Sequence, residues 1–228
     1  MSKEQSRILL GVIAYFLLVF YVFGLARTGS VQDPVLAPAP APAPAPAIAT
    51  ALLCFNLESK ILRESDSNLG CSIDEASLGD APIDHGDIRP NVLNPIFEVR
   101  FLAAQAAAKA AGFSIRITSG FRSEALQEKL FGDAIKKYGS EVEASKWVLP
   151  KDISHHPWGT AIDVNYPGDK TAVKWLKDNG SLFGLCRVYE NEWWHFEPII
   201  APGDTCPAMM VNALESLEEP PTSANESN

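Results

Sequence analysis

The chain has 228 residues, of which 46% are hydrophobic, 21% charged and 9% aromatic. This length is enough for one ordinary globular domain with additional segments, and the aliphatic content excludes a chain that is disordered throughout. The 19 Lys and Arg residues against 28 Asp and Glu residues give a net charge of −9. This charge argues against a protein that binds nucleic acid, because binding to phosphates requires a basic surface.

An uncharged, strongly apolar run extends from Ile8 to Ala26. A helix rises about 1.5 Å per residue, so this run nearly matches a hydrocarbon core of about 30 Å. No polar stripe interrupts it, as one would in an amphipathic core helix. We therefore predict that residues 1–27 form a cytoplasmic stub and an uncleaved transmembrane signal anchor. A secretory signal cleaved after the small-x-small pattern that ends at Ala26 is the alternative.

The flanking cations predict how this helix is oriented. Lys3 and Arg7 precede the apolar run, and only Arg27 follows it closely. Because positive charge is retained on the cytoplasmic side, the N-terminus is expected in the cytoplasm and everything after the helix outside the cell membrane. The predicted location is thus the cell membrane, with a single pass and contact with the lipid bilayer.

Two further segments cannot fold into a core. Within residues 28–53, Ala37 to Ala47 alternate Ala and Pro, which predicts an extended polyproline II spacer between the membrane and the folded part. Residues 209–228 combine acidic residues with Pro, Ser and Asn, which predicts an acidic, disordered tail. The folded domain is therefore expected over residues 54–208, and we expect it to be a monomer.

The four cysteines contain no C-x-x-C pair, which argues against a four-thiolate zinc site. In an exported domain an even number of cysteines indicates disulfides, and four cysteines allow three connectivities. The shortest loops are closed by pairing Cys54 with Cys71 and Cys186 with Cys206, and this is the pairing that we predict. Buried free thiols would be expected instead if the domain stayed in a reducing compartment.

Between Cys54 and Cys206 the periodicity alternates between helix and strand. Capping residues, prolines and glycines mark the ends of three helices. In chain order we predict a helix over 94–112, a strand over 114–118, a helix over 124–138, a strand over 160–165, a helix over 169–179, and strands over 185–189 and 193–197. This order predicts an α+β fold with a small, mostly antiparallel sheet and flanking helices.

Two stretches contain the residues best suited to chemistry. The first is Ser154-His155-His156-Pro157-Trp158-Gly159-Thr160-Ala161-Ile162-Asp163, and the second runs from Tyr189 to Glu197 and includes Glu192 and His195. Two neutral imidazoles and one carboxylate suit zinc, and three protein ligands leave a fourth position open for water. A metal lowers the pKa of its bound water to about 7, which makes a nucleophile at neutral pH, and a nearby Glu can carry the proton to a leaving amine.

These stretches resemble the LAS metallopeptidases, and more closely the VanY-like D-alanyl-D-alanine carboxypeptidases. Three motifs occur in the family's order. The pattern S-x-H-x-x-G-x-A-x-D is matched by Ser154, His156, Gly159, Ala161 and Asp163; the pattern E-x-W-H is matched by Glu192, Trp194 and His195; and the upstream S-G-[YF]-R-S with a later glutamine is matched by residues 119–123 and Gln127. The resemblance covers roughly residues 89–198.

The resemblance implies a LAS/hedgehog-like peptidase fold and a site with one zinc ion. By that resemblance His156, Asp163 and His195 are the zinc ligands and Glu192 is the general base. Arg122, Gln127 and Ser154 are the substrate-binding residues. A guanidinium binds a carboxylate with two hydrogen bonds, which suits recognition of a free peptide C-terminus.

The resemblance thus implies a membrane-anchored zinc D,D-carboxypeptidase that removes the terminal D-alanine from peptidoglycan stem peptides. An L,D-carboxypeptidase or an endopeptidase with the same site is an alternative, and so is a zinc-bearing module that binds cell wall without hydrolysing it. Each residue taken alone also has an ordinary structural explanation: His156 in a core, Asp163 at a strand end, Glu192 in a solvated turn and Arg122 in a surface ion pair. The three motifs together favour the metal site.

Overall fold

The computed structural model describes residues 52–65 and 69–217. The chain divides into two units, residues 1–47 and residues 48–228, and the elements below all belong to the second. The predicted membrane anchor and most of the predicted linker lie outside the described residues. Within the described ranges, no helix has the length and apolar character that would let it cross a membrane.

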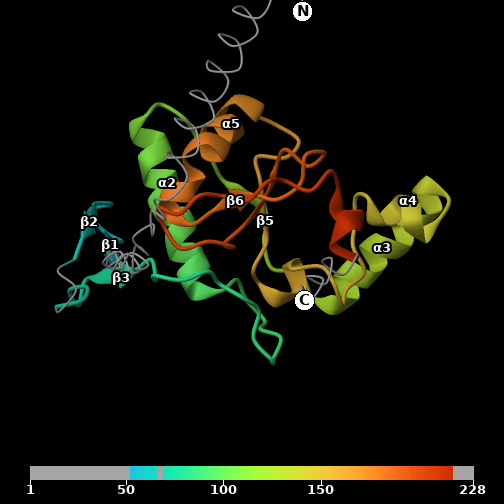
Figure 1. The fold of residues 1–228 in the computed structure, drawn as a ribbon, viewed down its shortest axis with the longest axis horizontal. Coiled ribbons are helices and arrows are strands. Elements are labelled where there is room, and N and C mark those ends of the chain that lie inside the picture. Colours follow the sequence, from blue (N-terminus) through green and yellow to red (C-terminus); the bar gives the residue numbers. More distant parts are fainter. Residues whose placement is uncertain (1–51, 66–68, 218–228) are drawn as a thin grey trace, which may run out of the picture. The chain divides into compact units, whose positions relative to one another are not determined.

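The described residues form two small antiparallel sheets with helices around them (Figure 1). The first sheet has the order β2-β1-β3, made of β1 (Leu53–Asn56), β2 (Leu62–Glu64) and β3 (Glu75–Ser77). The second has the order β4-β5-β7-β6, made of β4 (Ile117–Ser119), β5 (Ile162–Val164), β6 (Cys186–Arg187) and β7 (His195–Glu197). The predicted α+β class with a small antiparallel sheet is confirmed.

The described residues also form four α-helices and three short 3-10 helices. The α-helices are α2 (Pro95–Ala110), α3 (Glu124–Tyr138), α4 (Glu141–Ser145) and α5 (Lys170–Asn179). The 3-10 helices are η1 (His156–Trp158), η2 (Gly180–Phe183) and η3 (Ala213–Leu217). In Figure 1, α2 and α5 lie on one side of β5 and β6, whereas α3 and α4 lie on the other side.

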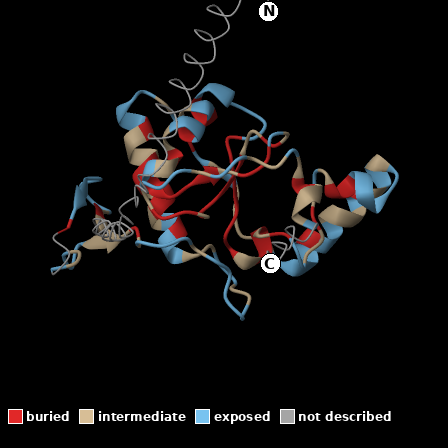
Figure 2. Ribbon diagram, in the orientation of Figure 1, coloured by how far each residue is buried: buried red, intermediate tan, exposed pale blue. Residues whose placement is uncertain are grey.

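The core lies between α2, α5 and the second sheet, where Figure 2 shows the buried residues gathered. All three residues of β5 and of β7 are buried, so these strands are covered on both faces. The side chain of Arg100 is fully buried in the same region and donates hydrogen bonds to the carbonyl oxygens of Leu78, Ala81 and Ile200. Because each of its three nitrogens has a hydrogen-bond acceptor, a buried guanidinium is tolerated there and joins two distant segments to α2.

The predicted helix boundaries agree closely with the structure. Helix α3 begins after its N-cap Ser123 and ends at Gly139, which has a φ of 88°, a left-handed conformation that favours glycine. The side chain of Asp169 caps α5 by accepting hydrogen bonds from two backbone N–H groups. The predicted disulfides Cys54–Cys71 and Cys186–Cys206 are both present.

The N-cap of α2 joins this helix to the loop that precedes β5. The Asn94 side chain accepts hydrogen bonds from the N–H groups of Ile96 and Phe97, and its backbone N–H donates to the Gly159 carbonyl at 2.9 Å. We expect Asn94→Ala to lower the free energy of unfolding by about 1 kcal/mol, because two N–H groups lose their acceptor. Asn94→Ser keeps an acceptor and should remain within about half of that loss. Urea denaturation of both variants measures this, and equal losses would contradict the capping role.

The strands are shorter than predicted, and one is shifted. The prediction of a strand over 114–118 is wrong in its first half, because β4 spans Ile117–Ser119. The Asn165 side chain accepts from the backbone N–H of Arg116 and donates to the carbonyl of Ser114. The backbone N–H of Asn165 also donates to the carbonyl of Arg116, so this single residue supplies the hydrogen bonds beyond the end of β5. The predicted strands over 160–165, 185–189 and 193–197 similarly shrink to the three-residue β5, the two-residue β6 and the three-residue β7.

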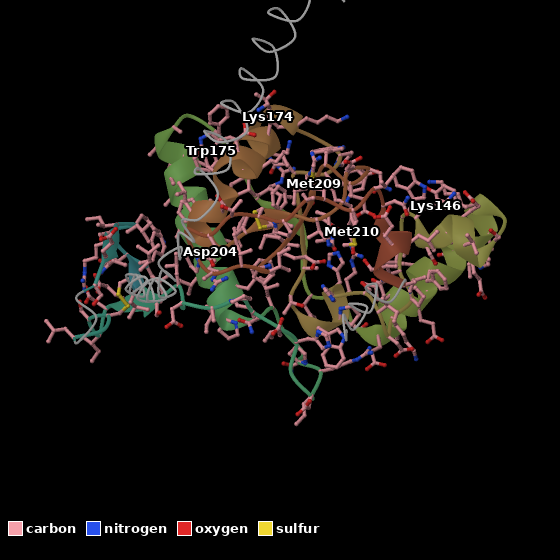
Figure 3. All side chains as sticks on the ribbon, in the orientation of Figure 1. Lys146, Lys174, Trp175, Asp204, Met209 and Met210 are labelled. Carbon is pink, nitrogen blue, oxygen red and sulfur yellow. A yellow bond between two sulfur atoms is a disulfide. The ribbon has the colours of Figure 1, made fainter. Side chains whose placement is uncertain are left out.

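The folded unit also extends beyond the predicted boundary at residue 208. Met210, labelled in Figure 3, exchanges backbone hydrogen bonds with Val188 and Glu190. Ala213 is buried, and the hydroxyl groups of Tyr189 and Ser216 lie 2.9 Å apart. The prediction of a disordered tail is therefore wrong for residues 209–217, because their apolar side chains pack against the end of the sheet. The rest of the predicted tail lies outside the described residues.

Candidate metal centre and active site

Two neighbouring strands bring the predicted ligands together. Asp163 in β5 is paired directly with His195 in β7, and His156 lies in η1, just before the turn that leads into β5. One side-chain ligand atom from each of the three residues lies within 4.8 Å of the others, and all three residues are buried. The three predicted ligands thus form one cluster. Their order in the sequence does not by itself require this, because it depends on the fold.

The hydrogen bonds around this cluster leave two lone pairs pointing at the same oxygen. Nδ1 of His156 donates to the Gly120 carbonyl at 2.8 Å, so its Nε2 carries a lone pair, 3.5 Å from Oδ1 of Asp163. Nε2 of His195 donates to Glu197 at 2.8 Å, so a neutral ring presents the lone pair of Nδ1 to the same Oδ1 at 3.2 Å. Lone pairs and a carboxylate repel one another unless a proton or a cation lies between them. The donor set and its orientation therefore fit a divalent metal ion.

Glu192 lies beside the cluster, in the turn before β7. Its Oε2 is 3.9 Å from Nδ1 of His195, and only 5% of the residue is exposed. Burial raises the pKa of Glu192 to about 7, against the lowering effect of His195. A carboxyl group with this pKa can take up and release a proton near neutral pH, as a general base requires.

Arg122 is held by three partners at the edge of the cluster. It forms an ion pair with Oδ2 of Asp163, and it donates to the Ser119 hydroxyl at 2.8 Å and to the Gln127 side chain at 3.2 Å. Burial lowers the pKa of Arg122, and Asp163 acts in the opposite direction. Gln127 is almost completely buried, and its amide donates to the Leu149 carbonyl at 2.8 Å. In this arrangement Gln127 holds the guanidinium in place.

A cavity of about 580 Å³ contains all of these groups. It has the size and the convergent polar groups of a small-molecule or peptide site. All seven predicted site residues line it, namely Arg122, Gln127, Ser154, His156, Asp163, Glu192 and His195. Aromatic side chains form much of the rest of its wall, namely Tyr138, Trp147, Tyr166, Tyr189 and Trp194.

The sequence analysis missed two residues of this site, Glu197 and His155. The carboxylate of Glu197 is 2% exposed and accepts hydrogen bonds from Nε2 of His195 at 2.8 Å and from Nδ1 of His155 at 2.7 Å. Burial raises the pKa of Glu197, but these bonds outweigh it and lower the pKa to about 2. The sequence contained one signal for Glu197, namely its spacing of two residues from His195, because residues two apart on a strand lie on the same face.

The comparison with protein families identifies the segment that carries this site. Residues 91–197 match the family model VanY, described as D-alanyl-D-alanine carboxypeptidase. This match covers just under half of the chain, so residues 91–197 are similar to the VanY family. All seven predicted site residues fall within this segment.

Several solved structures are similar to part of this chain. Vancomycin resistance D,D-pentapeptidase VanY from a VanB-type cassette, in complex with Zn(II), has 21% identity and a TM-score of 0.44, over 50% of this chain and 78% of that one. VanYB in complex with D-alanine-D-alanine has 21% identity and a TM-score of 0.44, over 53% and 78%. DacB from Streptococcus pneumoniae D39 has 29% identity and a TM-score of 0.42, over 54% and 76%. No curated protein matches the chain.

Proposed function

We propose that the chain is a zinc D,D-carboxypeptidase that removes the terminal D-alanine from peptidoglycan stem peptides. The observation that carries the proposal is the convergence of His156, Asp163 and His195 beside a buried Glu192 in one cavity. The VanY family match supports the reaction class. Two imidazoles and one carboxylate are a ligand set of catalytic zinc sites, which keep one position open.

The residues of the site would have different roles in the reaction. His156, Asp163 and His195 would hold the zinc ion, which supplies a Lewis acid and makes water a nucleophile near neutral pH. Glu192 would take the proton of the attacking water and pass it to the amine of the departing D-alanine. The buried cavity wall would keep other water away from the reacting groups.

Arg122 favours an exopeptidase over an endopeptidase. A free C-terminal carboxylate is the group that a guanidinium recognises best, and an endopeptidase has no such carboxylate next to the bond that it cuts. Ser154 lines the same cavity and would contact the substrate. Release of D-alanine from tetrapeptides by an L,D-carboxypeptidase is the second candidate, because the same ligands and base serve that bond equally.

We also propose that residues 1–27 anchor the chain in the cell membrane with the catalytic domain outside it. The uncharged run from Ile8 to Ala26 and the cations before it support this location. Two disulfides in the described part of the chain are consistent with an oxidising compartment. Such an enzyme would meet its substrate, the peptidoglycan, directly.

The experiment that tests the proposal compares three substrates with the zinc-loaded chain. They are a pentapeptide stem ending in D-Ala-D-Ala, a tetrapeptide stem ending in one D-Ala, and crosslinked muropeptides. We expect loss of one alanine from the pentapeptide by mass spectrometry, abolished by a chelator and restored by zinc. Loss from the tetrapeptide alone would instead establish the L,D-carboxypeptidase. Stoichiometric zinc without hydrolysis of any substrate would establish a non-catalytic wall-binding module.

A further inference from the structure

One face of helix α3 lines the cavity along its whole length. Leu126, Leu130 and Lys137 all line it, and their spacings of four and seven residues place them on one face of the helix. The start of α3 lies at Arg122 and Gln127, beside the metal ligands. Lys137 lies in the last turn, so this face runs from the metal centre to a lysine.

Lys137 is an unpaired cation of this cavity. Arg122 forms an ion pair with Asp163 and is the residue proposed to bind the terminal carboxylate, and the neighbouring Lys136 pairs with Asp133 at 3.2 Å. In the parts of the chain that the structure describes, no carboxylate forms an ion pair with Lys137. The cavity therefore presents a positive charge that the protein itself leaves without a counter-ion.

An aromatic ring lies against this ammonium group. Nζ of Lys137 lies 4.7 Å from the centre of the Tyr138 ring. Tyr138 stacks on Trp147, with ring centres 6.2 Å apart. Trp147 follows Lys146, which is labelled in Figure 3. The hydrogen bond with Tyr138 raises the pKa of Lys137, and Tyr166 acts in the same direction. Tyr166 in turn packs on Trp194, with ring centres 4.2 Å apart, and it lines the same cavity as His195.

The length of α3 sets how far this charge lies from the cleaved end of a substrate. Gln127 and Lys137 are ten residues apart, which corresponds to about 15 Å along a helix axis. An extended peptide covers that distance in about four residues. The long flexible stem of lysine shortens the separation to two or three residues.

We propose that Lys137 forms a subsite for a carboxylate that the substrate peptide carries two or three residues before its cleaved terminal residue. This inference rests on the carboxypeptidase function proposed above and adds a substrate class to it. The enzyme would select acidic stems, in which a free carboxylate is present at that distance, over stems in which it is amidated or replaced by an amine. The rings of Tyr138 and Trp147 would pack against the stem beside that carboxylate.

The test uses matched pairs of pentapeptides that end in D-Ala-D-Ala. In each pair one peptide carries a free carboxylate two or three residues before the last, and the other carries the carboxamide at the same place. We expect the zinc-loaded chain to show a kcat/KM about three- to tenfold higher for the acid in at least one pair, as a partly exposed charge-assisted contact allows. Lys137→Met should remove that preference, and Lys137→Glu should reverse it.

Lys136→Met is the matched control. It removes the adjacent charge on the same helix, but Lys136 is paired with Asp133 and does not line the cavity. The acid preference should therefore survive in this variant. A preference that persists in Lys137→Met, or that falls equally in Lys136→Met, would overturn the subsite.

A binding measurement separates this inference from the proposed function. Calorimetric titration of the Glu192→Gln variant with the same peptides measures affinity without turnover. One outcome is that the unmodified chain hydrolyses no peptide, while Glu192→Gln binds the acid peptide more tightly than the amide and loses this difference in affinity when Lys137→Met is added. In that case the proposed function fails and the subsite stands. Equal affinity for acid and amide, with hydrolysis intact, refutes the subsite alone.

Discussion

Glu192→Gln is expected to lower kcat for release of D-alanine by about 10²- to 10⁴-fold while the protein still binds one zinc ion. The amide keeps nearly the same volume but cannot take up the proton of the attacking water. The side chain of Glu192 lies 3.9 Å from Nδ1 of His195, so it is close to the reacting groups but is not part of the three-residue cluster. Zinc content by atomic absorption and D-alanine release by a coupled assay measure the two properties separately.

Glu190→Gln is the matched control for this substitution. Glu190 lies two residues earlier and is exposed, and it should leave both zinc content and kcat within about twofold of the unmodified protein, as for most surface substitutions. Retention of full activity by Glu192→Gln would exclude Glu192 as the general base. Loss of zinc from Glu192→Gln would show instead that this carboxylate is a ligand.

Replacement of Glu197 is expected to weaken zinc binding without removing a ligand. The carboxylate of Glu197 accepts from Nε2 of His195, which leaves Nδ1 of that ring as the free lone pair. A second hydrogen bond, from His155, fixes the carboxylate itself. Such outer partners of a ligating histidine set its tautomer and its orientation, and their loss usually costs 10- to 100-fold in metal affinity. We therefore expect a loss of about 10- to 100-fold for Glu197→Leu.

Glu197→Gln distinguishes orientation from simple disruption of the core. Its carbonyl oxygen can still accept from His195, but its amide cannot also accept from His155, so the loss of affinity should be clearly smaller than for Glu197→Leu. Competition with a chromophoric chelator measures zinc affinity, and far-ultraviolet circular dichroism confirms that each variant is folded. Unchanged zinc affinity in folded Glu197→Leu would contradict the positioning role.

The helices were predictable because their signals are local. A capping side chain, an apolar periodicity and a terminal glycine all act within a few residues, as at Ser123 and Gly139 around α3. The strands were less predictable, because a strand ends where its partner ends. The side chain of Asn165 bonds to the backbone of Ser114 and Arg116 across about fifty residues of chain, and no local pattern indicates such a contact.

The C-terminal boundary failed for a related reason. Residues 209–228 were judged by average composition, in which glutamates and prolines dominate. The short apolar run from Met209 to Leu214 is stabilised only when it packs against Val188 and Tyr189, since apolar side chains gain stability when other groups cover them. Backbone pairing of Met210 with Val188 then secures the segment at the end of the sheet.

The sequence by itself determined which residues are the candidates for a metal site, because two histidines, an aspartate and a glutamate in these spacings match the motifs of a metallopeptidase family. The tertiary structure alone decided which further groups act on that centre. Glu197 in β7 joins His195 to His155, which directly precedes η1, and Lys137 lines the cavity because α3 lies along it. The physical reason is range: the identity of a ligand is a property of one side chain, whereas its tautomer, its charge and its neighbours depend on which distant segments pack against it.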